Sequence, residues 1–562
     1  QSGRAAEMAS TFDSTLLPGS ARRTLFRRRA RRILPQYYTP EYHALWPVVK
    51  IALFLTGVLL AMFTGLFVAV GGTLALKFVG FPIGIFTVLI LWLLPDVDRP
   101  DKPPFMKLLT IYLALMALWP SYIAIVLPGL PWLTPPRIML AVMLVMMLAH
   151  FPQDATSRRK VADLLTWDRW AFRLYVGYIC IAIAVLPLAR DPLGSFTYGL
   201  LQETLALAPM VMAAWLFATV GNVDRVLNVI LLGGIASMLI AVLENIMQVP
   251  PWVGYVPSFM QIDPVAIEII YSPQARVGDS RYRIRSVFPV VLYYTQYLNL
   301  LLPLFIYKVW RAKGRARVLA WALVPLILHT VWFANARTAF IPLFSSLFGL
   351  AGLVLIRTSF FRTRGDSLPG GIMVVLLLVC MGLMGGALAT SHRLQMYTFG
   401  GAQHAASNDS REKQWENAWS QLAKNPIGVG VGNSPDVVGI SNTKTTRPVV
   451  DSLWINQLVD IGVLGFVCYF GFYFRLVWIG VQTFLRADGE EEEMAGVLAL
   501  GVLNFVISAY VISHTDNNYI LMVFAIATLA LARRQQHRLG GSREPQALAG
   551  PAFARGTALA TR

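Results

Sequence analysis

The sequence predicts an all-α polytopic membrane protein, and three observations carry this prediction. Its 562 residues are 56% hydrophobic and only 14% charged, whereas a soluble domain is about 45–50% apolar and about 25% charged. The mean hydropathy is +0.57. Apolar runs of about 20 residues, the length that a helix needs to cross a bilayer, recur along the chain. This composition excludes a soluble globular protein.

The apolar runs define about fourteen candidate transmembrane helices. They are residues 47–70, 73–95, 106–127, 135–151, 170–189, 198–219, 224–247, 288–307, 317–334, 338–356, 370–390, 456–481, 492–512 and 517–532. The chain is expected to divide into a basic cytoplasmic tail, a first bundle, a loop, central helices, a large loop, C-terminal helices and a cytoplasmic tail. The corresponding ranges are 1–45, 46–247, 248–287, 288–390, 391–455, 456–532 and 533–562.

The orientation follows from the basic residues of the short loops, which stay in the cytoplasm. The loops that contain 157–160, 308–317 and 357–365 fall on the same side as the Arg-rich tail segment 21–32. The two long connections then lie on the outer face, which is the periplasm if the membrane is a bacterial inner membrane. Loops of that length usually carry structure or function of their own.

The net charge of +18 would suit a nucleic-acid partner. However, most Lys and Arg lie in loops and tails between apolar runs, where they set topology and contact anionic lipid. The three cysteines lie inside apolar runs without metal-ligand spacing. We therefore expect the lipid bilayer as a partner, no nucleic acid, no metal and no cofactor.

The large outer loop contains a helical and a glycine-rich segment. In "DSREKQWENAWSQLAKN" (409–425), two tryptophans and a leucine recur at helical spacing, which predicts an amphipathic surface helix capped by Asp409 or Ser410. The following "NPIGVGVGN" (425–433) lacks the lysine of a nucleotide-binding loop. It is interpreted as a tight turn that lets backbone approach a ligand or helix. The acidic run 490–493 is expected to be a solvated cytoplasmic turn.

Four arginines at predicted outer boundaries are candidate ligands of a phosphate-bearing substrate. Arg283 and Arg285 lie in "RYRIRSVFP", where alternate spacing places Arg281 on the same side; Arg337 lies in the turn "FANARTAF", and Arg411 in the amphipathic helix. Arginine suits bidentate recognition of phosphate oxygens. The alternatives are snorkelling to lipid headgroups, and for Arg411 the basic character of any surface helix.

Asp451 lies in "RPVVDSLWINQLVDIGVLG" (447–465), where the chain enters the bilayer from the outer loop. One interpretation is a helix cap, which would stabilise the helix that begins near Ser452. The other is a general base that takes a proton from an attacking hydroxyl. Asp460, further along the same helix, is expected to make a polar contact with another helix.

The motifs together resemble the O-antigen ligase/polymerase family. The resemblance rests on "SREKQWENAWSQLAKNPIGVGVGN", "VDSLWINQLVDIGVLGF", "FANARTAF" and "RIRSVFP", and it covers roughly residues 281–470. It implies a glycosyltransferase of the GT-C type with two long periplasmic loops, which needs neither metal nor nucleotide sugar. The donor would be a polyprenyl-diphosphate-linked oligosaccharide; Arg285 and Arg337 would bind its diphosphate, and Arg411 would assist.

One departure from the family pattern concerns the reaction. Ligases of the family carry a His-Asn pair where this chain has Asp451-Ser452. This favours a polymerase of polysaccharide repeat units, with a flippase and chain-length or export proteins as partners. The alternatives are an O-antigen ligase that transfers glycan to lipid A core and, in another class, a transporter of lipid-linked oligosaccharide. Charge concentrated on one outer face fits an enzyme better than a transporter, which needs ionisable residues at mid-membrane.

Overall fold

The computed structural model of the protein describes residues 104–126, 133–151, 154–262, 282–358, 405–441 and 448–541, together with a few isolated positions. Residues 104–144 and 159–541 belong to one unit of the chain, which contains every site discussed below; residues 145–158 belong to a second unit. The predicted spans 47–70, 73–95 and 370–390 lie outside the continuously described segments.

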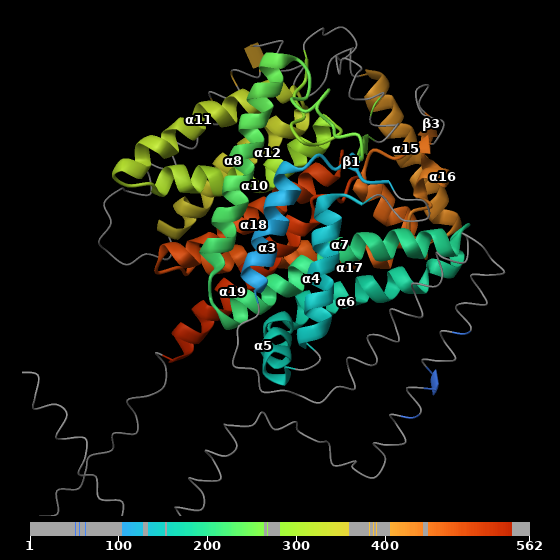
Figure 1. Ribbon diagram of the computed structural model, residues 1–562, viewed down its shortest axis with the longest axis horizontal. Helices are drawn as coiled ribbons and strands as arrows, with labels where there is room; N and C mark the ends of the chain where they lie inside the picture. The colour runs from blue at the N-terminus through green and yellow to red at the C-terminus, as the bar shows by residue number, and fades with distance from the viewer. Residues whose placement is uncertain are drawn as a thin grey trace, which may run out of the picture. The chain divides into compact units, whose positions relative to one another are not determined.

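The described segments are helical almost throughout (Figure 1). The helices are α3 (Phe105–Leu118), α4 (Pro135–His150), α5 (Ala155–Leu165), α6 (Arg169–Ala184), α7 (Pro192–Thr219), α8 (Val223–Met247), α10 (Val291–Arg311), α11 (Arg315–Ala334), α12 (Arg337–Ile356), α15 (Ala405–Lys424), α16 (Ser434–Val438), α17 (Leu453–Leu485), α18 (Glu490–Ala509) and α19 (Asn518–Gly541), with a short 3₁₀ turn at Leu186–Leu188. Two two-stranded antiparallel ribbons pair β1 (Ile123–Ala124) with β2 (Gln261–Ile262), and β3 (Ile440–Ser441) with β4 (Pro448–Val449).

The prediction of an all-α polytopic membrane protein is confirmed. In the described part of the chain, six helices are long and apolar enough to cross a membrane, or seven if the bent pair α4 and α5 counts as one span. Outward-facing Leu232, Val318 and Leu464 are exposed, as expected of side chains that face lipid. α5 is a short helix in a segment for which the sequence predicted only a basic loop.

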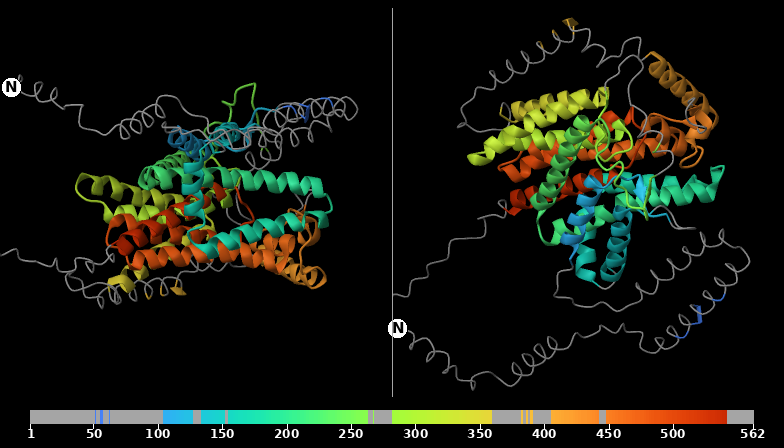
Figure 2. Two further views of the ribbon diagram at one scale, coloured as in Figure 1. Left: turned by 90° about the horizontal axis from the view of Figure 1, so that it is seen from below. Right: turned by 45° about the horizontal axis from the view of Figure 1, so that its top comes forward.

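The helices pack around α18, whose apolar span is almost entirely buried. α17 and α19 lie beside α18, and α10 and α12 pack against it from another side (Figures 1 and 2). α6 packs on α17, α7 packs on α19, and α3 packs on α8. Small residues allow close approach, since a Cβ added to Gly480 would lie 2.4 Å from the Cβ of Ala499. The C-terminal helices thus form the centre of this unit.

One predicted span is too long. Residues 106–127 were expected to form one helix, but α3 ends at Leu118, and Trp119 is extended. Pro120 follows directly, and a proline disfavours helical backbone in the residue before it. The chain then forms β1, which pairs with β2 from the first long loop. This ribbon ties that loop to the end of α3.

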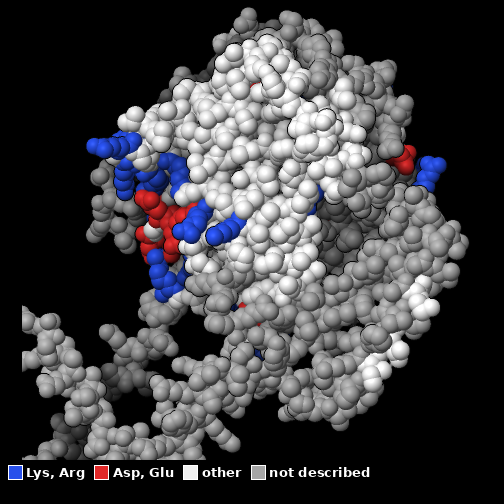
Figure 3. Space-filling model, in the orientation of Figure 1, with Lys and Arg blue, Asp and Glu red and all other residues white. Residues whose placement is uncertain are grey.

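Charged side chains gather at one end of the bundle (Figure 3). Glu493 is buried and binds Arg311 of α10 and Arg357 at the end of α12. Glu491 pairs with Arg534 and Glu492 with Arg538, both of α19. The expectation of a solvated turn at 490–493 is therefore wrong, because these carboxylates connect α18 to three neighbouring helices. The Lys and Arg of this end are those that the sequence assigned to the cytoplasm.

Candidate functional site

The candidate site residues lie at the opposite end of the same helices. α10, α12 and α17 all begin there, and α11 and α18 end there. The segments that meet are the turn before α10, the α11–α12 turn, α15, the entry to α17 and the α18–α19 connection. Their contacts are described in turn, because they decide which of the predicted residues come together.

Arg285 is fully buried in this structure. Its Nε lies 3.6 Å from Oε1 of Glu244 on α8, and both side chains are inaccessible to solvent. The same carboxylate accepts hydrogen bonds from the backbone N–H of Arg285 (3.0 Å) and Ser286 (2.7 Å), and from the hydroxyl of Tyr282 (2.8 Å). A buried carboxylate with this many donors is well satisfied. Contact between Arg285 and a diphosphate stays a prediction, and it requires this ion pair to open.

Arg283 contacts a different helix. Its Nε donates to the carbonyl of Ala334 at the end of α11 (3.2 Å), and the neighbouring Ile284 N–H donates to Phe333 O (3.3 Å). These two bonds fix the turn before α10 to the end of α11, whereas Glu244, the partner of Arg285, lies on α8. Arg281 lies outside the described residues, so the predicted three-arginine row is not described as a whole.

Arg337 and Arg411 come together from distant parts of the chain. Arg337 is the first residue of α12 and is half-buried, and Arg411 lies in the second turn of α15. The charge of Arg411 acts on Arg337, so the two guanidinium groups lie within electrostatic range of each other. Two cations held side by side attract a doubly charged anion, and the cost of their repulsion falls when such an anion binds.

α15 also connects this pair to Asp451. Gln414, one turn after Arg411, donates from Nε2 to Val449 O (3.0 Å), and its Oε1 accepts the N–H of Asp451 (3.2 Å). Residues one turn apart share a face of a helix. The face of α15 that carries Arg411 therefore also holds the backbone of Asp451, so one helix connects the predicted arginine with the segment of the predicted base.

The helix that follows Asp451 is capped by Ser452, whose Oγ accepts the N–H of Ile455 (3.5 Å). The interpretation of Asp451 as this cap is therefore wrong: the cap is the next residue. Asp451 is half-buried, and the described residues provide no hydrogen bond to its carboxylate. Its side chain remains available for chemistry.

The amphipathic helix is confirmed, but its beginning differs from the prediction. α15 begins at Ala405, so neither Asp409 nor Ser410 is its cap. Trp415 packs against a buried cluster that includes Ala418 and Ile455, and it stacks on Trp419 with ring centroids 6.0 Å apart. α15 is thus docked on α17 through one face and is not a free surface helix.

The glycine-rich turn binds Asp460. The Asp460 carboxylate accepts the N–H groups of Gly432 (2.8 Å) and Ser434 (2.7 Å), and its carbonyl accepts the N–H of Gly430 (2.9 Å). Gly428 has φ of 109°, and a Cβ there would lie 2.5 Å from the carbonyl oxygen of Asp460. The predicted close approach of this turn to a helix is found. The expected contact of Asp460 with another helix is found at Ser434, the first residue of α16, and Asp460 also contacts the glycine-rich turn.

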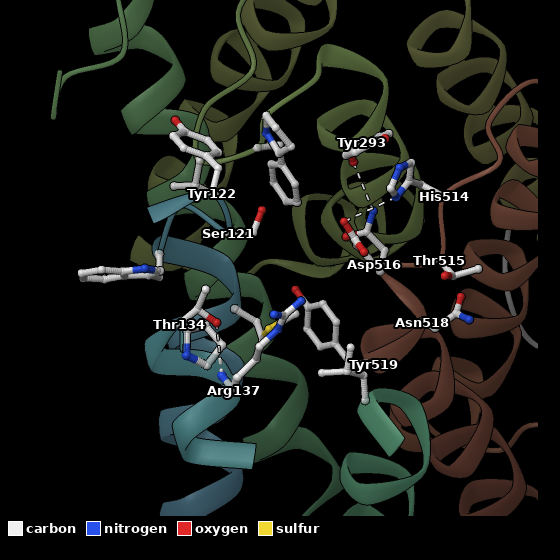
Figure 4. Close-up of a pocket in the computed structure, with 18 of the residues that line it drawn as sticks. Ser121, Tyr122, Thr134, Arg137, Tyr293, His514, Thr515, Asp516, Asn518 and Tyr519 are labelled. Carbon is white, nitrogen blue, oxygen red and sulfur yellow. Dashed lines mark hydrogen bonds and ion pairs between the residues drawn. The ribbon is translucent and has the colours of Figure 1, made fainter. Parts of the chain in front are cut away.

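Sequence reasoning missed a cavity beside these residues that has several polar side chains in a largely apolar lining (Figure 4). His514 and Asp516, in the connection between α18 and α19, form an ion pair with 3.5 Å between Nδ1 and Oδ2. Both line a cavity of about 370 Å³ with Arg137 of α4 and Tyr293 of α10. The signal was the polar run "SHTDNN" (513–518) between two apolar spans, which is dense in hydrogen-bonding groups for so short a connection.

The fold and the site together define a helical membrane protein. Its candidate site residues lie at the end of the bundle opposite to the charged cluster around Glu493, as in an enzyme that acts at a membrane surface. Residues 315–470 match the family model described as O-antigen ligase. The match includes Arg337, Arg411 and Asp451 and leaves Arg285 and His514 outside. No curated protein matches the chain. The family indicates a membrane enzyme with activity of the ligase or polymerase type.

Proposed function

We propose that the protein is a polysaccharide polymerase, which joins oligosaccharide repeat units carried on polyprenyl diphosphate. The observation that carries the proposal is the joint placement of Arg411 and Gln414 on α15. Arg411 faces a second cation, Arg337, and Gln414 holds the backbone of Asp451. Displacement of a diphosphate by a hydroxyl needs cations that stabilise the leaving group and a carboxylate that takes the hydroxyl proton.

In the proposed reaction, the acceptor hydroxyl oxygen attacks the anomeric carbon of the donor sugar. The new C–O bond forms as the bond to the diphosphate breaks, and the configuration at that carbon inverts. Asp451 takes the hydroxyl proton as general base. Arg337 and Arg411 stabilise the charge that develops on the leaving diphosphate, which is the step where fixed cations lower the barrier most.

The proposed location of the active site is the periplasmic face of a bacterial inner membrane. The ion-paired Lys and Arg at the other end of the bundle support it, because basic residues of short loops stay in the cytoplasm. The diphosphate-linked donor would then be used on the outer face, after a flippase has delivered it. Chain-length or export proteins would receive the product.

A ligase that transfers the glycan to lipid A core is the second candidate, since the matched family model is described as O-antigen ligase. The observation that favours the polymerase is Asp451-Ser452 in the place where the ligases that it resembles carry His-Asn. Both candidates use the same chemistry at the donor and differ in the acceptor.

The test is transfer by the purified protein in lipid nanodiscs with a lipid-linked repeat unit. A ladder of products supports the polymerase, and a single transfer to added lipid A core supports the ligase. If neither product forms, the proposal that the protein is a glycosyltransferase is refuted. Arg337→Ala and Arg411→Ala should each lower the rate by roughly 10²–10³, the usual cost of one lost transition-state donor. Lys413→Ala is the matched control, since Lys413 is an exposed cation on the same helix.

Asp451→Asn should fold normally and be nearly inactive, because the amide keeps the size of the carboxylate and cannot take the proton. The N–H of residue 451 still binds Gln414 in this variant, so the loop stays in place. A fully active Asp451→Asn variant would remove Asp451 from the proposed mechanism and leave the diphosphate site standing.

A further inference from the structure

The cavity beside His514 is enclosed by segments from five parts of the chain (Figure 4). Its volume of about 370 Å³ is in the range of small-molecule sites. Its lining includes the aromatic residues Trp119, Tyr122 and Tyr293 and the charged or ionisable residues Arg137, His514 and Asp516. All of them belong to one unit of the chain.

The polar groups of the cavity include both signs of charge. Burial would raise the pKa of Asp516, but the charge and hydrogen bond of His514 and the charge of Arg137 outweigh it, so the pKa lies below the ordinary 3.8. Asp516 is therefore ionised at neutral pH. Its side chain remains 46% accessible, which means that the carboxylate faces the cavity and can accept hydrogen bonds from a guest.

The connection that carries His514 and Asp516 is held in place by side-chain and backbone groups of α10. Gln296 of α10 donates to the carbonyl of His514 (3.2 Å), and its Oε1 accepts from Asn517 (3.0 Å), which also donates to Tyr293 O (3.1 Å). The Tyr293 and His514 rings lie with centroids 3.5 Å apart. A site built from fixed groups loses little entropy when a ligand binds.

Aromatic rings form the other wall. Trp119 and Tyr122 come from the segment between α3 and β1, and the Tyr122 hydroxyl accepts from Trp252 of the first long loop (2.9 Å). A pyranose ring has apolar C–H faces and a rim of hydroxyls that both donate and accept. Aromatic walls with a carboxylate, a guanidinium, amides and hydroxyls between them match both features of that ring.

The cavity adjoins the proposed reaction site. The N–H of Leu453, two residues after Asp451, donates to the carbonyl of Ile512, two residues before His514 (3.3 Å). Thr515 lines this cavity and a second one, of about 430 Å³, which also includes Leu453 and Asp460. The segment that forms the polar wall of the cavity is therefore bonded to the segment that carries the proposed base.

We infer that this cavity is a carbohydrate subsite, in which His514, Asp516 and Arg137 bind hydroxyls of a sugar of the acceptor glycan while Trp119 and Tyr122 contact its ring. The assignment of this sugar to the acceptor glycan rests on the proposed function, but the binding of a sugar in the cavity does not depend on that function. Asp516 and Arg137 are positioning residues in this proposal, since they hold the sugar and take no part in breaking the bond to the diphosphate.

The experiment measures binding and transfer separately. The probe for binding is the soluble oligosaccharide repeat unit, released from the polysaccharide of the producing cell and free of lipid and diphosphate. Its binding to the full protein in nanodiscs is followed by saturation-transfer difference NMR. The variants are Asp516→Asn, Arg137→Gln and Arg337→Ala, with Asp488→Asn as the matched control, because Asp488 also forms an ion pair but at the other end of the bundle.

The wild type, Asp488→Asn and Arg337→Ala should bind the oligosaccharide, whereas Asp516→Asn and Arg137→Gln should weaken binding at least tenfold. Transfer by these two cavity variants should recover at high acceptor concentration, while transfer by Arg337→Ala should not. A wild type that does not bind the oligosaccharide, or cavity variants that bind it as well as the wild type, would overturn the inference. Binding that depends on Asp516 without any transfer would instead refute the proposed function and leave the subsite intact.

Discussion

Asp460 gives the sharpest stability prediction, because its carboxylate holds the turn between the two halves of the candidate site. Arg411 precedes this turn, and Asp451 follows it. The carboxylate accepts two backbone N–H groups, a partly buried one from Gly432 at 2.8 Å and a buried one from Ser434 at 2.7 Å. A buried N–H left without a partner costs about 1–3 kcal/mol, and a partly buried one costs less because water can reach it. Asp460→Ala should therefore lower the free energy of unfolding by about 2–5 kcal/mol.

Asp460→Asn separates the contributions of the two bonds. The amide oxygen can accept one N–H, but the amide nitrogen faces the other N–H as a second donor. About half of the loss, or roughly 1–3 kcal/mol, is expected. Asn456→Ala is the matched control, since Asn456 lies one turn earlier on α17 and accepts a single bond from the Ser434 hydroxyl (2.9 Å). It should cost about 0.5–1.5 kcal/mol, the value of a neutral hydrogen bond.

The assay is reversible unfolding of the protein in mixed micelles, followed by the loss of helical circular dichroism, together with the transfer assay on the same samples. Transfer should fall with stability in the Asp460 variants, because the turn positions Arg411 and Asp451. If Asp460→Ala unfolds no more easily than Asn456→Ala, the loop is not held by this carboxylate. If Asp460→Ala is unstable but transfers at the wild-type rate, the turn does not position the site.

Two further predictions concern acidic residues outside the spans. Asp168 caps α6 through the N–H of Ala171 and also binds Arg475 (2.7 Å), whereas Asp191 caps α7 without an ion pair among the described residues. Asp168→Ala should destabilise the protein by about 1 kcal/mol more than Asp191→Ala; equal melting temperatures would show that the pair contributes nothing. The pKa of Asp516 is lowered in the folded state, so its pair with His514 stabilises the protein above the ordinary aspartate range and is lost as the pH falls below it. The melting-temperature difference between wild type and Asp516→Asn should shrink from about pH 6 to about pH 3, and a constant difference would contradict this assignment.

Hydrophobic length predicted the helices well, for a physical reason. In a bilayer each backbone polar group must be satisfied within its own segment, so a run of about 20 apolar residues has no alternative to a helix. The predicted spans 224–247 and 338–356 differ by one residue at the start from α8 and α12. The error at α3 arose where a proline ended the helix within an apolar run, which hydropathy alone does not register.

The partners of the polar residues were less predictable. Arg285 and Glu244 lie 41 positions apart, and no local spacing relates them. The sequence identified Arg285 as an outer cation but not the carboxylate that neutralises it. His514 and Asp516 are neighbours in sequence, yet their importance depends on Arg137 and Tyr293, which come from α4 and α10. The partners of such polar residues are set by packing between distant segments, and the periodicity of the sequence does not predict which segments pack together.

α15 explains why the candidate arginine and the candidate base lie on one long loop. A diphosphate bound between Arg337 and Arg411 would offset the charge of both cations. Because Gln414 on the same helix as Arg411 holds the N–H of Asp451, α15 would fix the place of the base relative to the bound donor. Binding of the leaving group and placement of the base would then be coupled through one rigid helix, which would link donor binding to proton removal.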